Sequence, residues 1–252
     1  MKRTLILALV AVALLSLATP SFAQQKPPAQ QSPQRMELTM DGVGTISAPL
    51  QVVVLMTLLS FVPAILMTMT SFTRIVIVFH FMRQAIGTQE VPNNQILVGL
   101  ALFLTMFIMA PVGTAINDLA VQPAMAGKIS AMEAVERATP PLRGFMLKQT
   151  RETDLAMFIE LSKTPKPAKS DDLPMRVVIP AYVMSEIKTG FQMGFFVFIP
   201  FLLIDLVVST SLLSMGMMQL PPAMISLPFK LVLFVTVDGW SLVVKSLVRS
   251  FA

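Results

Sequence analysis

Four stretches of this chain are apolar and long enough to cross a lipid bilayer, and this length restricts the possible folds more than any other feature. They cover residues 50–72, 96–116, 190–213 and 223–247. A helix needs about 20 apolar residues to cross the hydrocarbon core, and it must satisfy its own backbone polar groups there. Only 13% of the residues are charged, against about 25% in a typical soluble domain. We therefore expect an all-α integral membrane protein.

Proline lies inside the first, third and fourth stretches, at Pro63, Pro200 and Pro228. A proline within a helix removes one backbone hydrogen bond and leaves a kink, which neighbouring helices can accommodate. We therefore expect two long, kinked helical hairpins that pack on protein neighbours. They would cover residues 47–117 and 189–252.

The N-terminus has the pattern of a secretory signal peptide. Lys2 and Arg3 precede a short apolar core, and Ser21-Phe22-Ala23 places small residues where a signal peptidase cleaves. We predict a signal peptide over residues 1–23, with an uncleaved anchor as the alternative. Residues 24–46 begin with a Gln/Pro-rich run and are expected to form a disordered periplasmic tether.

The segment between the two hairpins has a different composition. Residues 118–188 carry nearly as many acidic as basic side chains, and residues 132–160 have helical spacing of apolar residues. We expect two or three soluble helices here, followed by a loop over residues 162–174. An exported N-terminus and four crossings would make this helical region periplasmic. Lys245 and Arg249 would then also lie outside, against the positive-inside rule, so two hairpins are better supported than four ordinary spans.

Ionisable residues within apolar helices are candidate functional residues, because each is costly unless it is paired or hydrated. They are Arg74, Glu186, Lys188, Asp205, Lys230 and Asp238. Asp205 and Lys230 lie at similar distances from a hairpin tip near Gln219, within about one helical turn of each other. They could form an ion pair that fixes helix register, pair with a neighbouring subunit, or act as a proton relay or substrate contact.

The sequence gives no sign of catalysis or of a cofactor. It has no cysteine and a single histidine, His80, and it lacks the motifs of phosphate-binding loops, metalloproteases and serine hydrolases. We expect no enzyme activity, no catalytic residue, no bound metal and no cofactor. The formal net charge of +5 includes the residues of the signal peptide, so we expect no nucleic-acid partner.

Three separated blocks of the sequence resemble the FliP/SctR (YscR) family of type III export apparatus proteins. They are MTSFTRIVIVFHFMRQAIGTQEVPNNQILVGLALFLTMFIMAPV at 69–112, PAYVMSEIKTGFQMGF at 180–195 and SLPFKLVLFVTVDGWSL at 226–242. The blocks occur in the family's order, and the resemblance covers nearly all of the expected mature chain. A cleaved signal peptide is typical of the flagellar branch. The virulence injectisome branch is the alternative.

The resemblance implies a subunit of an export gate. Family members assemble in several copies with FliQ and FliR, alongside other export apparatus proteins, and pass unfolded flagellar proteins across the inner membrane at the flagellar basal body. The core of the assembly is raised towards the periplasm. Membrane lipid is a further expected partner. Glu186 and Lys230 match family positions that join neighbouring subunits.

A methionine-rich loop, SMGMMQLPP at 214–222, lies between the last two blocks. The resemblance implies that Met215, Gly216, Met217 and Met218 form a gasket in the pore. Methionine is unbranched and polarizable, so it can fill an irregular constriction, and an apolar constriction resists ions by dewetting. The alternative is that these methionines only pack a helix turn.

An ion-coupled small-molecule transporter is the remaining alternative function. Such proteins usually contain internal repeats with a binding site between broken helices, and the two hairpins here show no repeat. Asp205 and Lys230 are the features that favour a transporter.

Overall fold

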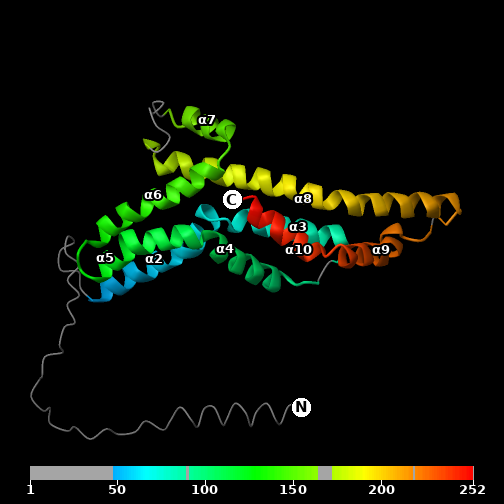
Figure 1. Ribbon diagram of the computed structural model, residues 1–252, viewed down its shortest axis with the longest axis horizontal. Coiled ribbons are helices and arrows are strands. Elements are labelled where there is room, and N and C mark those ends of the chain that lie inside the picture. Colours follow the sequence, from blue (N-terminus) through cyan, green and yellow to red (C-terminus); the bar gives the residue numbers. More distant parts are fainter. Residues whose placement is uncertain (1–47, 89–90, 164–171, 218, 252) are drawn as a thin grey trace, which may run out of the picture. The chain divides into compact units, whose positions relative to one another are not determined.

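The computed structural model describes residues 48–88, 91–163, 172–217 and 219–251 (Figure 1). Within these ranges the chain forms helices and turns and contains no strand, so the predicted all-α class is confirmed there. The predicted signal peptide and tether, residues 1–46, lie outside the described residues.

The first apolar stretch does not end in a hairpin tip. Helix α2 (Ala48–Met69) is followed after two residues by α3 (Phe72–Ile86), at an angle of 74°. Helix α3, whose inner face is buried, lies between this stretch and the next. The bend occurs at Thr70 and Ser71 rather than at Pro63, which lies inside α2. A hydrogen bond from a distant part of the chain stabilises the bend at Thr70. The hydroxyl of Tyr182 donates to the Thr70 carbonyl at 2.8 Å.

Helix α4 (Asn94–Ile116) matches the second apolar stretch closely. It begins where the Asn93 side chain accepts a hydrogen bond from the Ile96 N–H at 2.9 Å, a normal N-cap arrangement. A π-helical turn, η1 (Asn117–Val121), and the short α5 (Gln122–Met125) continue it.

Two further helices follow α5. Helix α6 (Ala131–Gln149) starts at the N-cap Ser130, whose hydroxyl accepts from the Glu133 N–H at 3.2 Å. Helix α7 (Glu152–Leu161) follows after Thr150 and Arg151. Most of the predicted loop after it, residues 164–171, lies outside the described residues.

Helix α8 (Met175–Ser214) is 40 residues long, about 60 Å at the usual helical rise. It runs without interruption across residues 188 and 189, where the composition suggested a boundary between the periplasmic region and the last hairpin. The charged residues near this point do not end the helix, because Glu186 and Lys188 have ion-pair partners on other helices.

The fourth apolar stretch forms two helices, α9 (Pro222–Thr236) and α10 (Gly239–Arg249), at an angle of 62°. The expected kink at Pro228 is not the sharp bend of this segment. The bend lies at Asp238, which has φ 51° and ψ 54°, a left-handed conformation that Asp tolerates better than most residues. Gly239 follows, and a Cβ atom there would lie 2.2 Å from the Phe234 ring.

Helix α3 lies at the centre of the packing. It runs beside α8 (Figure 1), and the contact is close because α8 presents Gly190 and Gly194. A Cβ at Gly190 would lie 3.1 Å from Ile77, and one at Gly194 would lie 2.6 Å from Phe81. Small residues of this kind allow helices to approach closely within membranes.

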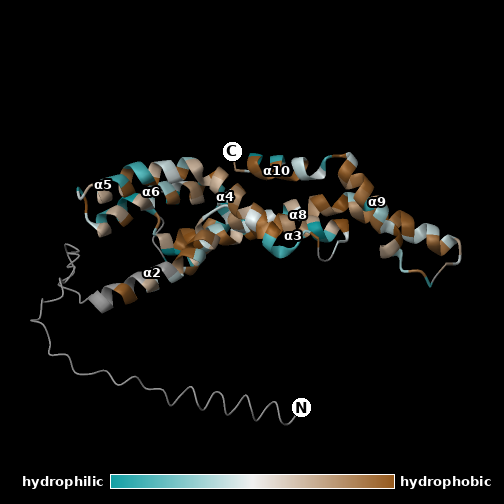
Figure 2. Ribbon diagram, turned by 90° about the horizontal axis from the view of Figure 1, so that it is seen from below, coloured by the Kyte–Doolittle hydropathy of each residue, from teal (hydrophilic) through white to brown (hydrophobic). Residues whose placement is uncertain are grey.

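Among the described residues, two helices are long and apolar enough to cross a membrane, the α4–α5 segment Asn94–Met125 and α8. The number rises to four if the bent pairs α2–α3 and α9–α10 each count as one span. Hydrophobic residues cover most of α9, whereas α5 and α6 are more polar (Figure 2).

Candidate functional site

The methionine-rich loop forms the turn between α8 and α9. The Gly216 N–H donates to the Leu213 carbonyl, and the Met217 N–H donates to the Leu212 carbonyl, both at 3.0 Å. This pair of bonds ends a helix with one left-handed residue, and Gly216 has φ 74°. The side chain of Met215 is 70% exposed and that of Met217 is 42% exposed. Met218 lies outside the described residues.

Asp205 on α8 and Lys230 on α9 are in direct contact within the chain. Lys230 Nζ lies 2.6 Å from Asp205 Oδ2, and the Ser226 hydroxyl donates to Asp205 Oδ1 at 2.6 Å. The Lys230 side chain is 7% exposed and that of Asp205 is 33% exposed. The two oxygens of one carboxylate thus each bind a different residue of α9, which fixes the register of α8 against α9.

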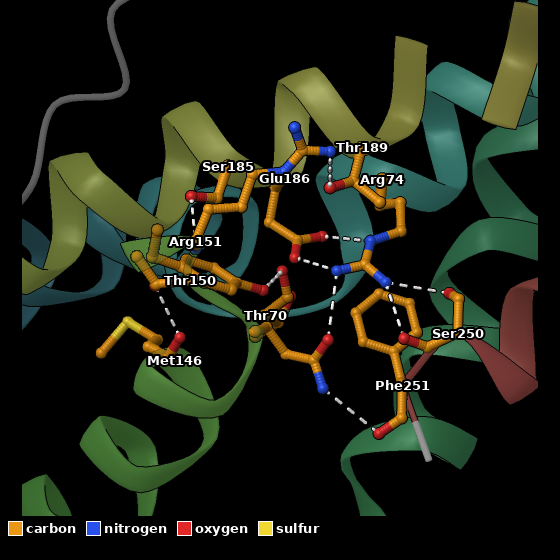
Figure 3. Close-up of polar contacts among 12 residues, drawn as sticks. Thr70, Arg74, Met146, Thr150, Arg151, Ser185, Glu186, Thr189, Ser250 and Phe251 are labelled. Atoms are coloured by element: carbon orange, nitrogen blue, oxygen red, sulfur yellow. Dashed lines mark hydrogen bonds and ion pairs between the residues drawn. The ribbon is translucent and has the colours of Figure 1, made fainter. Parts of the chain in front are cut away.

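Glu186 forms a second ion pair, with Arg74 on α3 (Figure 3). Arg74 Nε lies 2.9 Å from Glu186 Oε2, and Arg74 Nη2 lies 2.5 Å from Glu186 Oε1. Both side chains are almost inaccessible, at 3% and 0% exposed. The geometry is bidentate, which is the strongest arrangement for arginine and a carboxylate.

The other donors of Arg74 bind two further parts of the chain. Nη1 donates to the carbonyl oxygen of Ser250 at 3.0 Å and to its hydroxyl at 2.9 Å, and Nη2 also donates to Gln149 Oε1 at 3.2 Å. All five N–H donors of the guanidinium are therefore used. The Phe251 ring covers one face, with its centroid 3.8 Å from Arg74 Cζ. We call these five residues, Arg74, Glu186, Gln149, Ser250 and Phe251, the arginine cluster.

A third polar contact joins α7 to α8. Asp154, 1% exposed, accepts hydrogen bonds from Lys188 and, at 2.9 Å, from the Ser185 hydroxyl. Ser185 Oγ also accepts from the Arg151 N–H at 3.1 Å (Figure 3). Burial alone would raise the pKa of the Asp154 carboxyl. The hydrogen bonds from Lys188 and Ser185 and the positive charges of Lys188 and Arg151 outweigh burial and lower this pKa below its usual value.

The predicted site residues therefore form separate groups. Glu186 and Asp205 are 19 positions apart on one helix, about 28 Å, and each has its own partner. Sequence reasoning singled out both Arg74 and Glu186 but did not pair them, because they lie 112 positions apart. It missed Ser250, which lies 176 positions from Arg74. Gln149, Ser250 and Phe251 carried no signal, since a neutral amide, a serine and a phenylalanine near a helix end are ordinary. Among the described residues, no three His, Asp or Glu side chains group to hold a metal ion.

Comparisons with known proteins give one consistent result. The model of the FliP family matches residues 55–247. The chain is similar to the Flagellar biosynthetic protein FliP of Bacillus subtilis (strain 168), with 54% identity over 206 residues, 82% of this chain and 93% of that protein. It is similar to the protein of the same name from Pectobacterium carotovorum subsp. carotovorum, with 56% identity over 201 residues, 80% of this chain and 78% of that protein.

A more distant relative of the same name, from Borreliella burgdorferi (strain ATCC 35210 / DSM 4680 / CIP 102532 / B31), is 41% identical over 244 residues, 94% of this chain and 95% of that protein. The matched part of the chain includes α3, α8 and α9, with the Asp205–Lys230 pair and the methionine-rich loop. On both the family model and these relatives, the chain belongs to the FliP family.

Proposed function

We propose that this chain is a channel-forming core subunit of the flagellar type III protein export gate. In this proposal several copies assemble with FliQ and FliR in the bacterial inner membrane and pass unfolded flagellar proteins. The observation that carries the proposal is the family match over residues 55–247, together with relatives named flagellar biosynthetic proteins. These names favour the flagellar branch over the injectisome branch.

The methionine-rich loop is proposed as the seal of this channel. Met215 and Met217 are exposed at the end of α8, where a helix turn leaves their side chains without close packing. A ring of such loops, one from each copy, would place flexible apolar side chains around a central opening. These side chains could exclude ions by dewetting and still part around an unfolded chain.

The outer surfaces of α8 and α9 support an assembled rather than an isolated subunit. Large apolar side chains are exposed there, including Phe196 at 70%, Phe229 at 59% and Val235 at 75%. Apolar surface of this extent requires lipid or protein partners. We propose that other subunits cover part of it and lipid covers the rest.

The charged residues would act in register and assembly rather than in transport. The partly exposed Asp205 could add a contact to a neighbouring subunit while it keeps its bond to Lys230. The same pair, in apolar surroundings, is the one feature that favours an ion-coupled transporter.

Ion leak through the assembled gate tests the proposal. The chain would be co-expressed with its proposed FliQ and FliR partners, and the conductance of the native complex compared with that of a Met215/Met217/Met218→Ala variant. A matched control replaces three exposed methionines elsewhere, Met106, Met125 and Met132, which are 75%, 81% and 71% exposed.

We expect the loop variant to assemble and leak, and the native and control complexes to stay closed. A loop variant that assembles and stays closed would show that these methionines only pack the turn. A chain that forms no complex with the two partners would contradict the proposed function itself.

A further inference from the structure

The end of α10 binds a buried charge on a distant helix. Ser250 gives Arg74 two acceptors, its carbonyl and its hydroxyl oxygen, and the Phe251 ring covers the guanidinium. Gln149 Nε2 donates to the Phe251 carbonyl at 3.3 Å, and the rings of Phe145 and Phe251 stack with centroids 6.2 Å apart. These contacts attach the end of α10 to α3 and α6.

The body of α10 buries Val243 and Leu247 in the main hydrophobic core, but it also borders an open groove. This surface groove, of about 380 Å³, lies between α10, α3 and α8. Its lining residues are Val78, Met193, Phe196, Val197, Leu242, Val243 and Ser246. Side chains that line an open groove lack close-packed partners on that side within the chain. Trp240 packs edge-on against Phe79 and Phe234 at the start of α10, so aromatic contacts hold both ends of the helix.

The bend that precedes α10 is supported locally by the contact of Trp240 with Phe234, but its central residue has an unfavourable backbone conformation. Asp238 adopts a left-handed conformation and its side chain makes no capping bond. The segment from Pro222 to Arg249 is apolar enough to pass as a single span if it were straight. A tertiary contact at the far end of α10 would therefore help to keep the segment bent.

We infer that Ser250 and Phe251 form a clasp that closes on Arg74 and keeps the α9–α10 pair bent. The closed and open states of the clasp differ in free energy because Arg74 is buried. When it is closed, all five donors of Arg74 are bonded. When it is open, Arg74 Nη1 loses both acceptors that Ser250 provides. Its N–H donors are then buried and unsatisfied, which is unfavourable. The arginine cluster thus decides the path of the last helix, which makes the clasp a conformational device.

Cysteine labelling of the full-length, detergent-purified chain tests the clasp, and the native sequence contains no cysteine. A Val243→Cys reporter lies on α10 at a position 7% exposed, and a Val177→Cys reporter lies on α8 at a position 1% exposed. Both reporters replace a valine with a cysteine, so they differ only in position. Each reporter is combined with Phe251→Ala, which opens the clasp, and with Arg249→Ala, a control at an exposed position of the same helix end.

We expect Phe251→Ala to speed maleimide labelling at residue 243 by about tenfold or more, as for a local opening, and to leave residue 177 unchanged. Arg249→Ala should change neither rate. Phe251→Tyr keeps an aromatic face for Arg74 and should restore slow labelling. Gln149→Ala is a milder variant that removes only the bond to the Phe251 carbonyl and the shared bond to Arg74, so it should give a smaller increase at residue 243.

Unchanged labelling at residue 243 in both Phe251→Ala and Gln149→Ala would overturn the inference. A joint rise at residues 243 and 177 would also overturn it, because the cluster would then stabilise the whole fold rather than hold α10.

Discussion

Arg74 and Glu186 lie 112 positions apart in the chain and form a bidentate ion pair with N–O distances of 2.9 and 2.5 Å. The pair joins α3 to α8 where the α2–α3 bend meets the end of α10. Lysine cannot replace arginine here, because an ammonium group cannot bind both carboxylate oxygens, Gln149 and Ser250 in one plane. We expect Arg74→Lys to lower the free energy of unfolding by about 3 kcal/mol, as for a broken buried pair.

Denaturant titration of the detergent-purified chain would measure this loss. The control is Arg83→Lys, because Arg83 bonds the exposed Asn94 side chain instead, and the loss there should be below about 1 kcal/mol. Equal losses in the two variants would argue against a special role of the buried pair.

Gly194→Ala should disrupt the contact between α3 and α8. The added Cβ would lie 2.6 Å from the Phe81 ring, closer than packed carbon atoms approach. We expect a loss of about 1–3 kcal/mol, the usual effect of overpacking, measured by thermal or denaturant unfolding. Gly99→Ala is the matched control in α4, because its Cβ would meet nothing within 4 Å and alanine favours a helix. If Gly194→Ala and Gly99→Ala had the same free energy of unfolding, the close contact between α3 and α8 would not contribute to stability.

Asp154 should make the contact between α7 and α8 sensitive to acid. Its pKa in the folded chain is lowered, so the unfolded chain binds a proton at higher pH than the folded chain does. The stability that Asp154 contributes is therefore fully present above the unfolded pKa of about 3.9 and is lost as the pH falls through the folded value. Unfolding at a series of pH values between about 6 and 2 would show the loss, and Asp154→Asn should remove this part of the pH dependence. An unaltered pH profile in the Asn variant would contradict the assignment.

Asp205→Asn separates a structural role from a transport role. The amide keeps one acceptor but loses the charge that balances the buried Lys230. We expect a loss of about 1–3 kcal/mol, below that of a fully buried pair because a third of the Asp205 side chain is exposed. Less assembled complex should result, which gel filtration would measure. A variant that assembles normally but loses proton-coupled flux would instead favour the transporter.

The bend between α9 and α10 depends on residues that tolerate a left-handed backbone. Asp238→Gly should preserve the bend, because glycine adopts positive φ freely. Asp238→Val should disfavour it, because a β-branched residue strongly resists this conformation. The Val243→Cys labelling rate would report the difference, and equal rates in the two variants would show that the bend does not need positive φ.

The sequence by itself determined the helical class, the position of α4 and the turn at Gly216. Each depends on local chemistry: a long apolar run satisfies its backbone only as a helix, Asn93 caps the first turn of α4, and glycine permits the left-handed residue that ends α8. Counting residues from the tip also placed Asp205 near Lys230, because two antiparallel helices joined by a short turn have a fixed register.

Only the tertiary structure decided where the long apolar segments bend and how the buried charges pair. Proline indicated possible kinks, yet the sharp bends lie at Thr70–Ser71 and at Asp238. Tyr182 on a distant helix bonds the Thr70 carbonyl at the first bend, and Asp238 adopts a left-handed conformation at the second. Arg74 could not be matched to Glu186, Gln149 and Ser250 from the sequence, since its five donors are satisfied by residues up to 176 positions away. The partners of a buried charge such as Arg74 depend on which helices lie side by side, and this is decided by how the helices pack in the folded chain.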